Sequence, residues 1–211
     1  MKTEFDKKGY VIIRKAVSKD TAKFLYNYIL LKKEVTKFLY YHKYKHVCID
    51  TYGGFETEKD MIPGTYSVYA DIAMETLMLA VKPKLEKTIG CEVYPTYTYA
   101  RLYKTGDILK RHKDRFSCEV STTVLLGGNE WPIYVSKSKK INTKGVKIDL
   151  KQGDMLIYKG CEREHWREKF EGLHCAQVFL HYNKITSEGA DENKYDRRPY
   201  VGIPREFQKP K

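Results

Sequence analysis

The second half of the sequence is a series of short β-prone segments, and this pattern constrains the fold more than any other feature. The segments are rich in Val, Ile, Tyr and Thr, and turn residues such as Gly127-Gly128 and Gly153-Asp154 separate them. Segments of this length and spacing favour a β-sandwich or a barrel. We expect strands at residues 93–103, 117–126, 131–136, 145–150, 155–158, 165–168 and 176–182.

The first half reads differently, as one strand followed by helices. A β-branched and aromatic run covers residues 10–17, and Ser18 is expected to cap a helix that ends near Glu34. Asp71 is expected to cap a second helix, which Pro83 kinks or breaks and Gly90 terminates. Between the two helices, residues 50–66 have the composition of a loop, which near an active site could act as a lid.

Helices first and strands afterwards indicate an α+β fold within a single domain, residues 1–211. We expect a helical annex at about 18–90 and a β core at about 91–184. The polar tail at about 185–211 is expected to run over the surface as irregular chain.

Composition excludes several classes of protein. Of the 211 residues, 42% are hydrophobic and 31% are charged, which is typical of a globular protein and not of a disordered one. No apolar run is long enough to span a bilayer, and the N-terminus does not resemble a signal peptide. Five cysteines without a Cys-x-x-Cys pair suit a reducing compartment. We therefore expect a cytoplasmic protein with no membrane partner.

The formal charge of +12 has two interpretations. A basic surface attracts acidic partners, such as nucleic acid or an acidic protein. Lys, Tyr and Ile also have A/T-rich codons, so a biased genome would produce much of the same excess without selection for binding. The sequence leaves both interpretations open.

One short motif carries chemistry. His112 and Asp114 are two residues apart, so on an extended strand their side chains share one face. A second imidazole, His165, begins a later predicted strand, after the Gly153-Asp154 turn. Two imidazoles and one carboxylate form the facial triad that holds non-haem Fe(II) and leaves coordination positions open.

The order of these features resembles the Fe(II)/2-oxoglutarate-dependent oxygenases, in particular the prolyl-hydroxylase-like members. The resemblance covers roughly residues 5–184 and includes the helical N-terminal region. It implies a double-stranded β-helix core, of the jelly-roll or cupin type, with the helices packed on one sheet. It also implies that His112, Asp114 and His165 bind Fe(II), and that 2-oxoglutarate and O₂ are co-substrates.

The position that binds the distal carboxylate of 2-oxoglutarate departs from the family pattern. Many relatives have Arg or Lys nine or ten residues after the distal histidine, where this chain has His174 and Cys175. Arg167 or Tyr103 is expected to take this role, and His174 could assist. The implied activity is hydroxylation of a peptidyl or amino-acid side chain.

Several alternatives remain open. The substrate could be a nucleic-acid base or a nucleic-acid-bound protein, and a non-catalytic cupin-like binding module would keep the same barrel. His181 is an alternative distal ligand, and a zinc site could use His165 with Cys118, Cys161 or Cys175. Arg101, Arg115 and Glu119 are expected to surround the site or to pair with one another.

Overall fold

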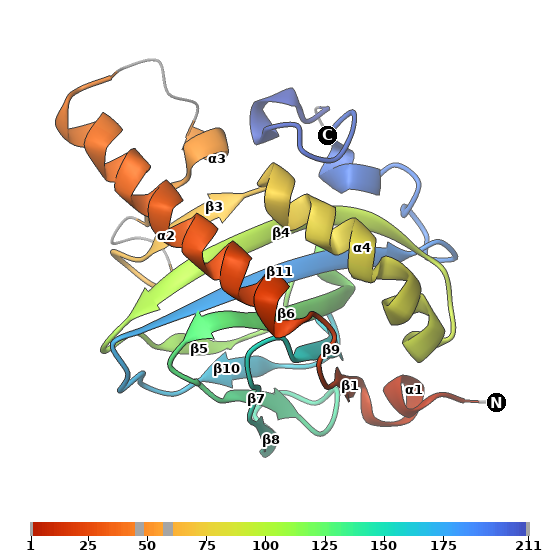
Figure 1. Ribbon diagram of the computed structural model, residues 1–211. Coiled ribbons are helices and arrows are strands. Elements are labelled where there is room, and N and C mark those ends of the chain that lie inside the picture. The colour runs from red at the N-terminus through yellow and green to blue at the C-terminus, as the bar shows by residue number, and fades with distance from the viewer. Residues whose placement is uncertain (1, 45–48, 57–60, 210–211) are drawn as a thin grey trace.

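The computed structural model describes residues 2–44, 49–56 and 61–209, and consists of two facing antiparallel sheets with helices on one of them (Figure 1). The helices are α1 (Glu4–Lys8), α2 (Lys19–Tyr41), α3 (Ile49–Tyr52), α4 (Ile72–Ile89) and the 3₁₀ turns η1 (Phe116–Cys118), η2 (Lys194–Arg197) and η3 (Arg205–Phe207). The strands are β1 (Tyr10–Ile13), β2 (Gly54–Phe55), β3 (Tyr66–Tyr69), β4 (Val93–Lys104), β5 (Leu109–His112), β6 (Val120–Gly128), β7 (Ile133–Ser136), β8 (Gly145–Ile148), β9 (Met155–Lys159), β10 (His165–Arg167) and β11 (His174–Lys184). None of the helices in these ranges has both the length and the apolar character needed to cross a membrane.

The larger sheet has the order β1-β9-β6-β11-β4-β3-β2, and the smaller sheet has the order β5-β10-β7-β8. From β4 onward the chain passes to the other sheet at each new strand, except for the β7–β8 pair within the smaller sheet, as in a jelly roll. Helices α2 and α4 lie across the outer face of the larger sheet (Figure 1). The structure confirms the expected α+β class and the packing of N-terminal helices on one sheet.

Alternation along β4 separates the two layers of the core. Ala100 and Leu102 face outward and pack in the cluster that contains the buried faces of α2 and α4. Tyr99, Arg101 and Tyr103 face the opposite way and line a cavity between the sheets. One face of β4 therefore holds the helices, and the other supplies side chains to the site.

The helices begin where the sequence predicts. Ser18 caps α2 and Asp71 caps α4, each accepting backbone N–H bonds, and Gly90 ends α4 at φ 76°. The expected end of α2 near Glu34 was wrong, because the helix continues to Tyr41. Of the two expected effects of Pro83, a break does not occur, because α4 runs from Ile72 to Ile89. Buried residues on both sides of Pro83 hold the two halves of α4 on the sheet, so tertiary packing outweighs the lost backbone bond.

The expected annex is not purely helical. β1 pairs with β9, and β2 and β3 extend the larger sheet beyond β4. The predicted loop at 50–66 thus contains α3 and β2, and its residues 57–60 lie outside the described part of the chain.

The tail was expected on the surface, and this was wrong for its central part. Asp196 and Arg198 are buried. Arg198 donates to Glu75 of α4 at 2.6 Å, and Asp196 accepts bonds from Arg115 and from the Tyr69 hydroxyl. Buried charges require partners, and these pairs fix the tail against the larger sheet.

Candidate active site

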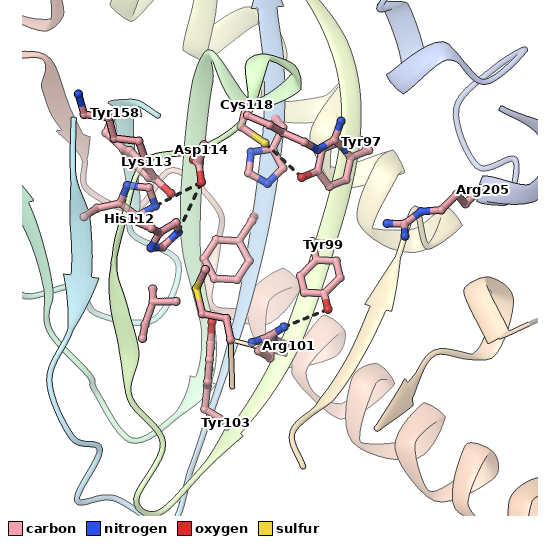
Figure 2. Close-up of a pocket in the computed structure, with 16 residues that line it drawn as sticks. Tyr97, Tyr99, Arg101, Tyr103, His112, Lys113, Asp114, Cys118, Tyr158 and Arg205 are labelled. Carbon is pink, nitrogen blue, oxygen red and sulfur yellow. Dashed lines mark hydrogen bonds and ion pairs between the residues drawn. The ribbon is translucent and has the colours of Figure 1, made fainter. Parts of the chain in front are cut away.

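A cavity of about 400 Å³ opens between the two sheets (Figure 2). Inward-facing residues of β4, β9 and β11 line it from the larger sheet, and β5 and β10 line it from the smaller one. His112, Asp114 and His165 lie together on its wall. The candidate metal ligands thus face a space large enough for small molecules.

The two histidines are cross-strand neighbours. His112 ends β5, His165 begins β10, and the two residues are directly opposite in the antiparallel pairing of these strands. Their ring centroids are 4.2 Å apart. A separation of 53 positions in sequence therefore becomes a direct contact at the end of one strand pair.

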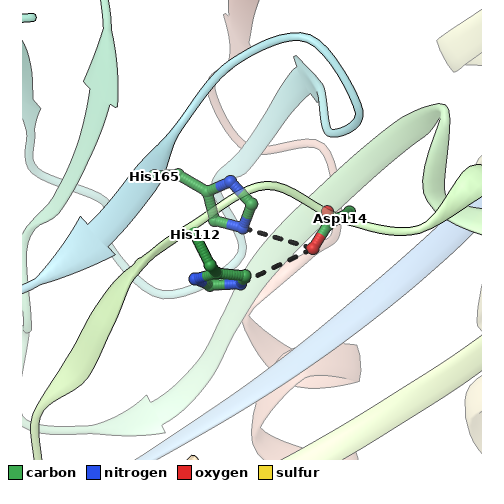
Figure 3. A group of neighbouring side chains, drawn as sticks. All are labelled: His112, Asp114 and His165. Atoms are coloured by element: carbon green, nitrogen blue, oxygen red, sulfur yellow. Dashed lines mark ion pairs between the residues drawn. The ribbon is translucent and has the colours of Figure 1, made fainter. Parts of the chain in front are cut away.

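Asp114 completes the group (Figure 3). Its Oδ1 lies 3.6 Å from His112 Nε2 and 3.4 Å from His165 Nε2, and the three ligand atoms lie within 4.8 Å of one another. Bonds of about 2 Å from these atoms would meet at one ion. The donor set and its geometry fit a divalent transition metal.

Backbone hydrogen bonds orient both imidazoles. His112 Nδ1 donates to the Lys110 carbonyl at 2.7 Å, and His165 Nδ1 donates to the Arg163 carbonyl at 3.2 Å. A carbonyl can only accept, so in the neutral ring the lone pair is on Nε2, which faces Asp114. Both rings are therefore oriented so that Nε2 can bind a metal ion.

The charges of His112, Asp114 and His165 act on one another within this group. Burial opposes the charged forms of Asp114 and His112, but their interactions outweigh it. The charge and hydrogen bonds of His165 and His112 hold the pKa of Asp114 well below its usual range. The hydrogen bond and charge of Asp114 raise the pKa of His112. Both shifts favour the charged form of the residue concerned.

Asp114 reaches its position differently from the sequence prediction. β5 ends at His112, so Asp114 is not on a strand. Its N–H donates to the Gly160 carbonyl at 3.0 Å, and Ser121 Oγ donates to its Oδ2 at 2.8 Å. If the strand continued, alternation would turn Lys113 and Arg115 away from the site. Because the strand has ended, Lys113 and Arg115 instead line the cavity.

Of the three expected co-substrate anchors, Tyr103 lines the cavity. Its ring packs edge-on against Trp131 with centroids 4.9 Å apart, and burial raises its pKa to about 12. The hydroxyl therefore keeps its proton at neutral pH and remains a hydrogen-bond donor.

Arg167 faces the barrel interior, as expected, but is fully buried and does not line the cavity. It donates to the Trp131 carbonyl, and its Nη2 lies 3.5 Å from Thr123 Oγ1. His174 lies on the face of β11 that is turned away from the cavity. Its Nε2 is hydrogen-bonded there to the hydroxyl of Tyr26 on α2. The structure does not bring His174 to the cavity, because alternation turns it toward the helices.

The alternative metal sets are only partly assembled. Cys118 and His181 lie with Asp114 as a second group of possible ligand atoms within 4.8 Å. Neither Cys161 nor Cys175 belongs to a candidate metal group among the described residues. Arg101 and Arg115 line the cavity, which agrees with the first of the two expectations for them. They pair with Glu56 and Asp196 and not with Glu119.

Sequence reasoning missed the residues that support Asp114. A Cβ on Gly160 would lie 2.5 Å from Asp114 Oδ2 and 2.6 Å from Ser121 Oγ, so only glycine fits there. No local sequence signal marks Gly160 or Ser121. In contrast, the period-two run Tyr97-x-Tyr99-x-Arg101-x-Tyr103 could have indicated one polar, inward face of a strand.

No protein-family model matches the sequence, and no curated protein matches it. Solved structures do match the fold. A prolyl-4-hydroxylase from Pseudomonas putida has a TM-score of 0.65 at 12% identity, with 86% of this chain and 95% of that chain covered. A prolyl hydroxylase from Trichoplax adhaerens, in complex with a hypoxia inducible factor peptide fragment, has a TM-score of 0.60 at 14% identity, covering 88% and 90%.

A third structure, HygX from Streptomyces hygroscopicus with nickel and 2-oxoglutarate bound, has a TM-score of 0.58 at 12% identity and covers 86% of this chain and 85% of that chain. These likenesses extend over most of each chain, and the two facing sheets have the topology described above. The chain therefore has the double-stranded β-helix fold of the Fe(II)/2-oxoglutarate oxygenases.

Proposed function

We propose that this protein is an Fe(II)- and 2-oxoglutarate-dependent dioxygenase, and that it hydroxylates a peptidyl or amino-acid side chain. One observation carries the proposal. Two imidazole Nε2 atoms and one carboxylate oxygen converge on the wall of a cavity, inside a fold shared with enzymes of this class. Three protein ligands would leave open positions on the ion for co-substrates.

His112, Asp114 and His165 are the proposed iron ligands. When bound, iron and 2-oxoglutarate supply the oxidising chemistry, with O₂ as the second co-substrate. The chain's own contribution is to fix the two imidazoles through the Lys110 and Arg163 carbonyls and the carboxylate through Ser121.

Tyr103 and Arg167 are the proposed partners of the distal carboxylate of 2-oxoglutarate. Both pack against Trp131. Among the described residues Arg167 has no ion-pair partner, and its Nε has no hydrogen-bond partner. Burial accordingly lowers its pKa. A carboxylate that reaches the Tyr103 hydroxyl would supply the negative charge that this buried guanidinium lacks.

The test is succinate formation from 2-oxoglutarate by the purified, Fe(II)-loaded protein, together with calorimetric binding of Mn(II) and then of 2-oxoglutarate. We expect turnover and metal binding in the wild type and neither in His112→Ala. His42→Ala removes an imidazole at the end of α2, which does not line the cavity, and should change nothing.

Two results would contradict the proposal. A protein that binds neither Mn(II) nor 2-oxoglutarate is not an oxygenase of this class. Metal and 2-oxoglutarate binding without any succinate, even with candidate peptides present, would instead support a non-catalytic binding module.

A further inference from the structure

Basic side chains outnumber acidic ones among the described residues that line the cavity. Arg101, Lys113, Arg115 and Arg205 line it, and Asp114 is the carboxylate among them, which the proposed function assigns to iron. Arg101 and Arg115 pair with Glu56 and Asp196, which lie outside the lining. A wall of this composition suits an anionic ligand better than a cationic one.

Arg101 differs from the other three cations because it is buried, with 8% of its surface exposed. Its Nη2 donates to the Tyr99 hydroxyl at 3.0 Å and lies 3.3 Å from Glu56 Oε1. Its Nε has no hydrogen-bond partner in the described part of the chain. A buried donor without a partner destabilises the folded protein, and a ligand oxygen that reached it would remove this cost.

Glu56 pairs with Nη2 of Arg101 but accepts no hydrogen bond from its Nε. The same Oε1 atom also accepts hydrogen bonds from Ser67 Oγ and the Tyr99 hydroxyl. This network holds the guanidinium through Nη2, and Nε stays buried without a hydrogen-bond partner among the described residues. A guanidinium edge binds a carboxylate through two parallel hydrogen bonds.

The surroundings of Arg101 are aromatic. Tyr97, Tyr99 and Phe179 line the same cavity, and Arg205 reaches toward it from the C-terminal tail (Figure 2). Rings and guanidinium groups together suit a group with an apolar body and an anionic end.

We infer that the substrate carries a carboxylate on the group that enters the cavity, and that Arg101 binds this carboxylate. The inference rests on the proposed function and names its substrate class. The cavity of about 400 Å³ also has to hold 2-oxoglutarate, so the entering group is the size of an acidic side chain or a small organic acid.

Two other substrates fit Arg101 less well. The ring of proline is neutral, so it brings no charge that would complement the Arg101 guanidinium. A nucleic-acid base that enters a pocket is also neutral, and its phosphates stay outside on the backbone. The buried position of Arg101 on β4 therefore favours a charge on the entering group itself.

The experiment measures binding of matched probes to the Mn(II)- and 2-oxoglutarate-loaded protein, from the broadening of probe proton signals by Mn(II). The peptide probes are acetyl-Gly-X-Gly-amide with X as Asp, Glu, Asn or Gln, and the small probes are the four free amino acids. We expect at least one acid to bind about tenfold more tightly than its amide.

This preference should disappear in Arg101→Met, persist in part in Arg101→Lys, and be unchanged in Arg14→Met. Arg14 pairs with Asp154 at the surface and does not line the cavity. Arg14→Met is therefore the control, because it removes one positive charge away from the cavity. Preference within the peptide set identifies a peptidyl substrate, and preference within the free amino acids alone identifies a small acid.

Three results would overturn the inference. The wild type could show no preference for acid over amide, or Arg101→Met could keep the preference. Arg101→Met could instead weaken 2-oxoglutarate itself tenfold, which would make Arg101 the co-substrate anchor. If the wild type binds neither Mn(II) nor 2-oxoglutarate, the proposed function fails, and calorimetry on the metal-free protein still decides whether the cavity prefers acids.

Discussion

If His112 is a metal ligand, as proposed, metal binding should depend on pH through this one residue. Metal binding requires the neutral imidazole, whereas Asp114 raises the pKa of His112 above 6.5. We expect Mn(II) affinity to fall about tenfold per pH unit below that raised pKa, because one proton competes with the ion. Titration calorimetry between pH 5.5 and 8 measures this, and an affinity that stays constant over the range would contradict it.

The stability of the metal-free protein should also depend on pH, through both His112 and Asp114. The raised pKa of His112 contributes stability that is fully present below about pH 6.5 and is lost as pH rises through the higher folded value. The lowered pKa of Asp114 contributes stability that is present above about pH 3.8 and is lost as pH falls through the folded value. The stabilisation gained on adding metal should therefore grow as pH rises toward 8.

Gly160 gives a second prediction at this scale. A methyl group there would overlap Asp114 Oδ2 and Ser121 Oγ, so Gly160→Ala should displace the carboxylate and weaken Mn(II) binding about 10–100-fold. Gly127→Ala is the matched control, because its added methyl meets the Tyr26 ring at 2.6 Å, away from the metal ligands. Equal Mn(II) affinity in the two variants would refute the role of Gly160.

At the scale of secondary-structure elements, the ends of the helices were predictable from local residues, whereas the end of β5 and the burial of the tail were not. Caps at Ser18, Asp71 and Gly90 were predictable because each depends on one residue and its immediate backbone. The end of β5 before Asp114 was not, because the partner of that backbone is Gly160, 46 positions later. The burial of the tail depends on Glu75 and Tyr69 in the same way.

The tail offers a prediction at the scale of an element. Arg198 and Glu75 have almost fully buried side chains and are joined at 2.6 Å, so Arg198→Met should destabilise the protein by about 3–5 kcal/mol by leaving one buried charge alone. Lys82→Met breaks the partly exposed i,i+4 pair with Glu86 and should cost about 0.5 kcal/mol. Urea unfolding measures both, and similar losses would show that the tail is not anchored through this pair.

At the scale of the whole molecule, the β-rich second half was the most predictable feature. Its short segments and turns predicted a sandwich or barrel, and the resemblance to the oxygenases implied the jelly roll and the grouping of His112, Asp114 and His165. The partner of each inward-facing side chain was not predictable, because it depends on register between strands. Arg167, which meets the Trp131 carbonyl and not the cavity, and His174, which faces α2, are the consequences.

Metal loading should stabilise the whole fold, because the ligands join β5, β10 and the chain that leads into β6. At 100 times the dissociation constant, Mn(II) should add about 2.7 kcal/mol to the free energy of unfolding. Hydrogen exchange should slow most at residues 109–118 and 159–167, which surround the ligands, and least at β2 and β3 on the far edge of the larger sheet.

The control for this prediction is His112→Ala, which should unfold at the same temperature with and without Mn(II). A shift that persists in this variant would mean that the ion binds elsewhere, and the assignment of the metal centre would then fail.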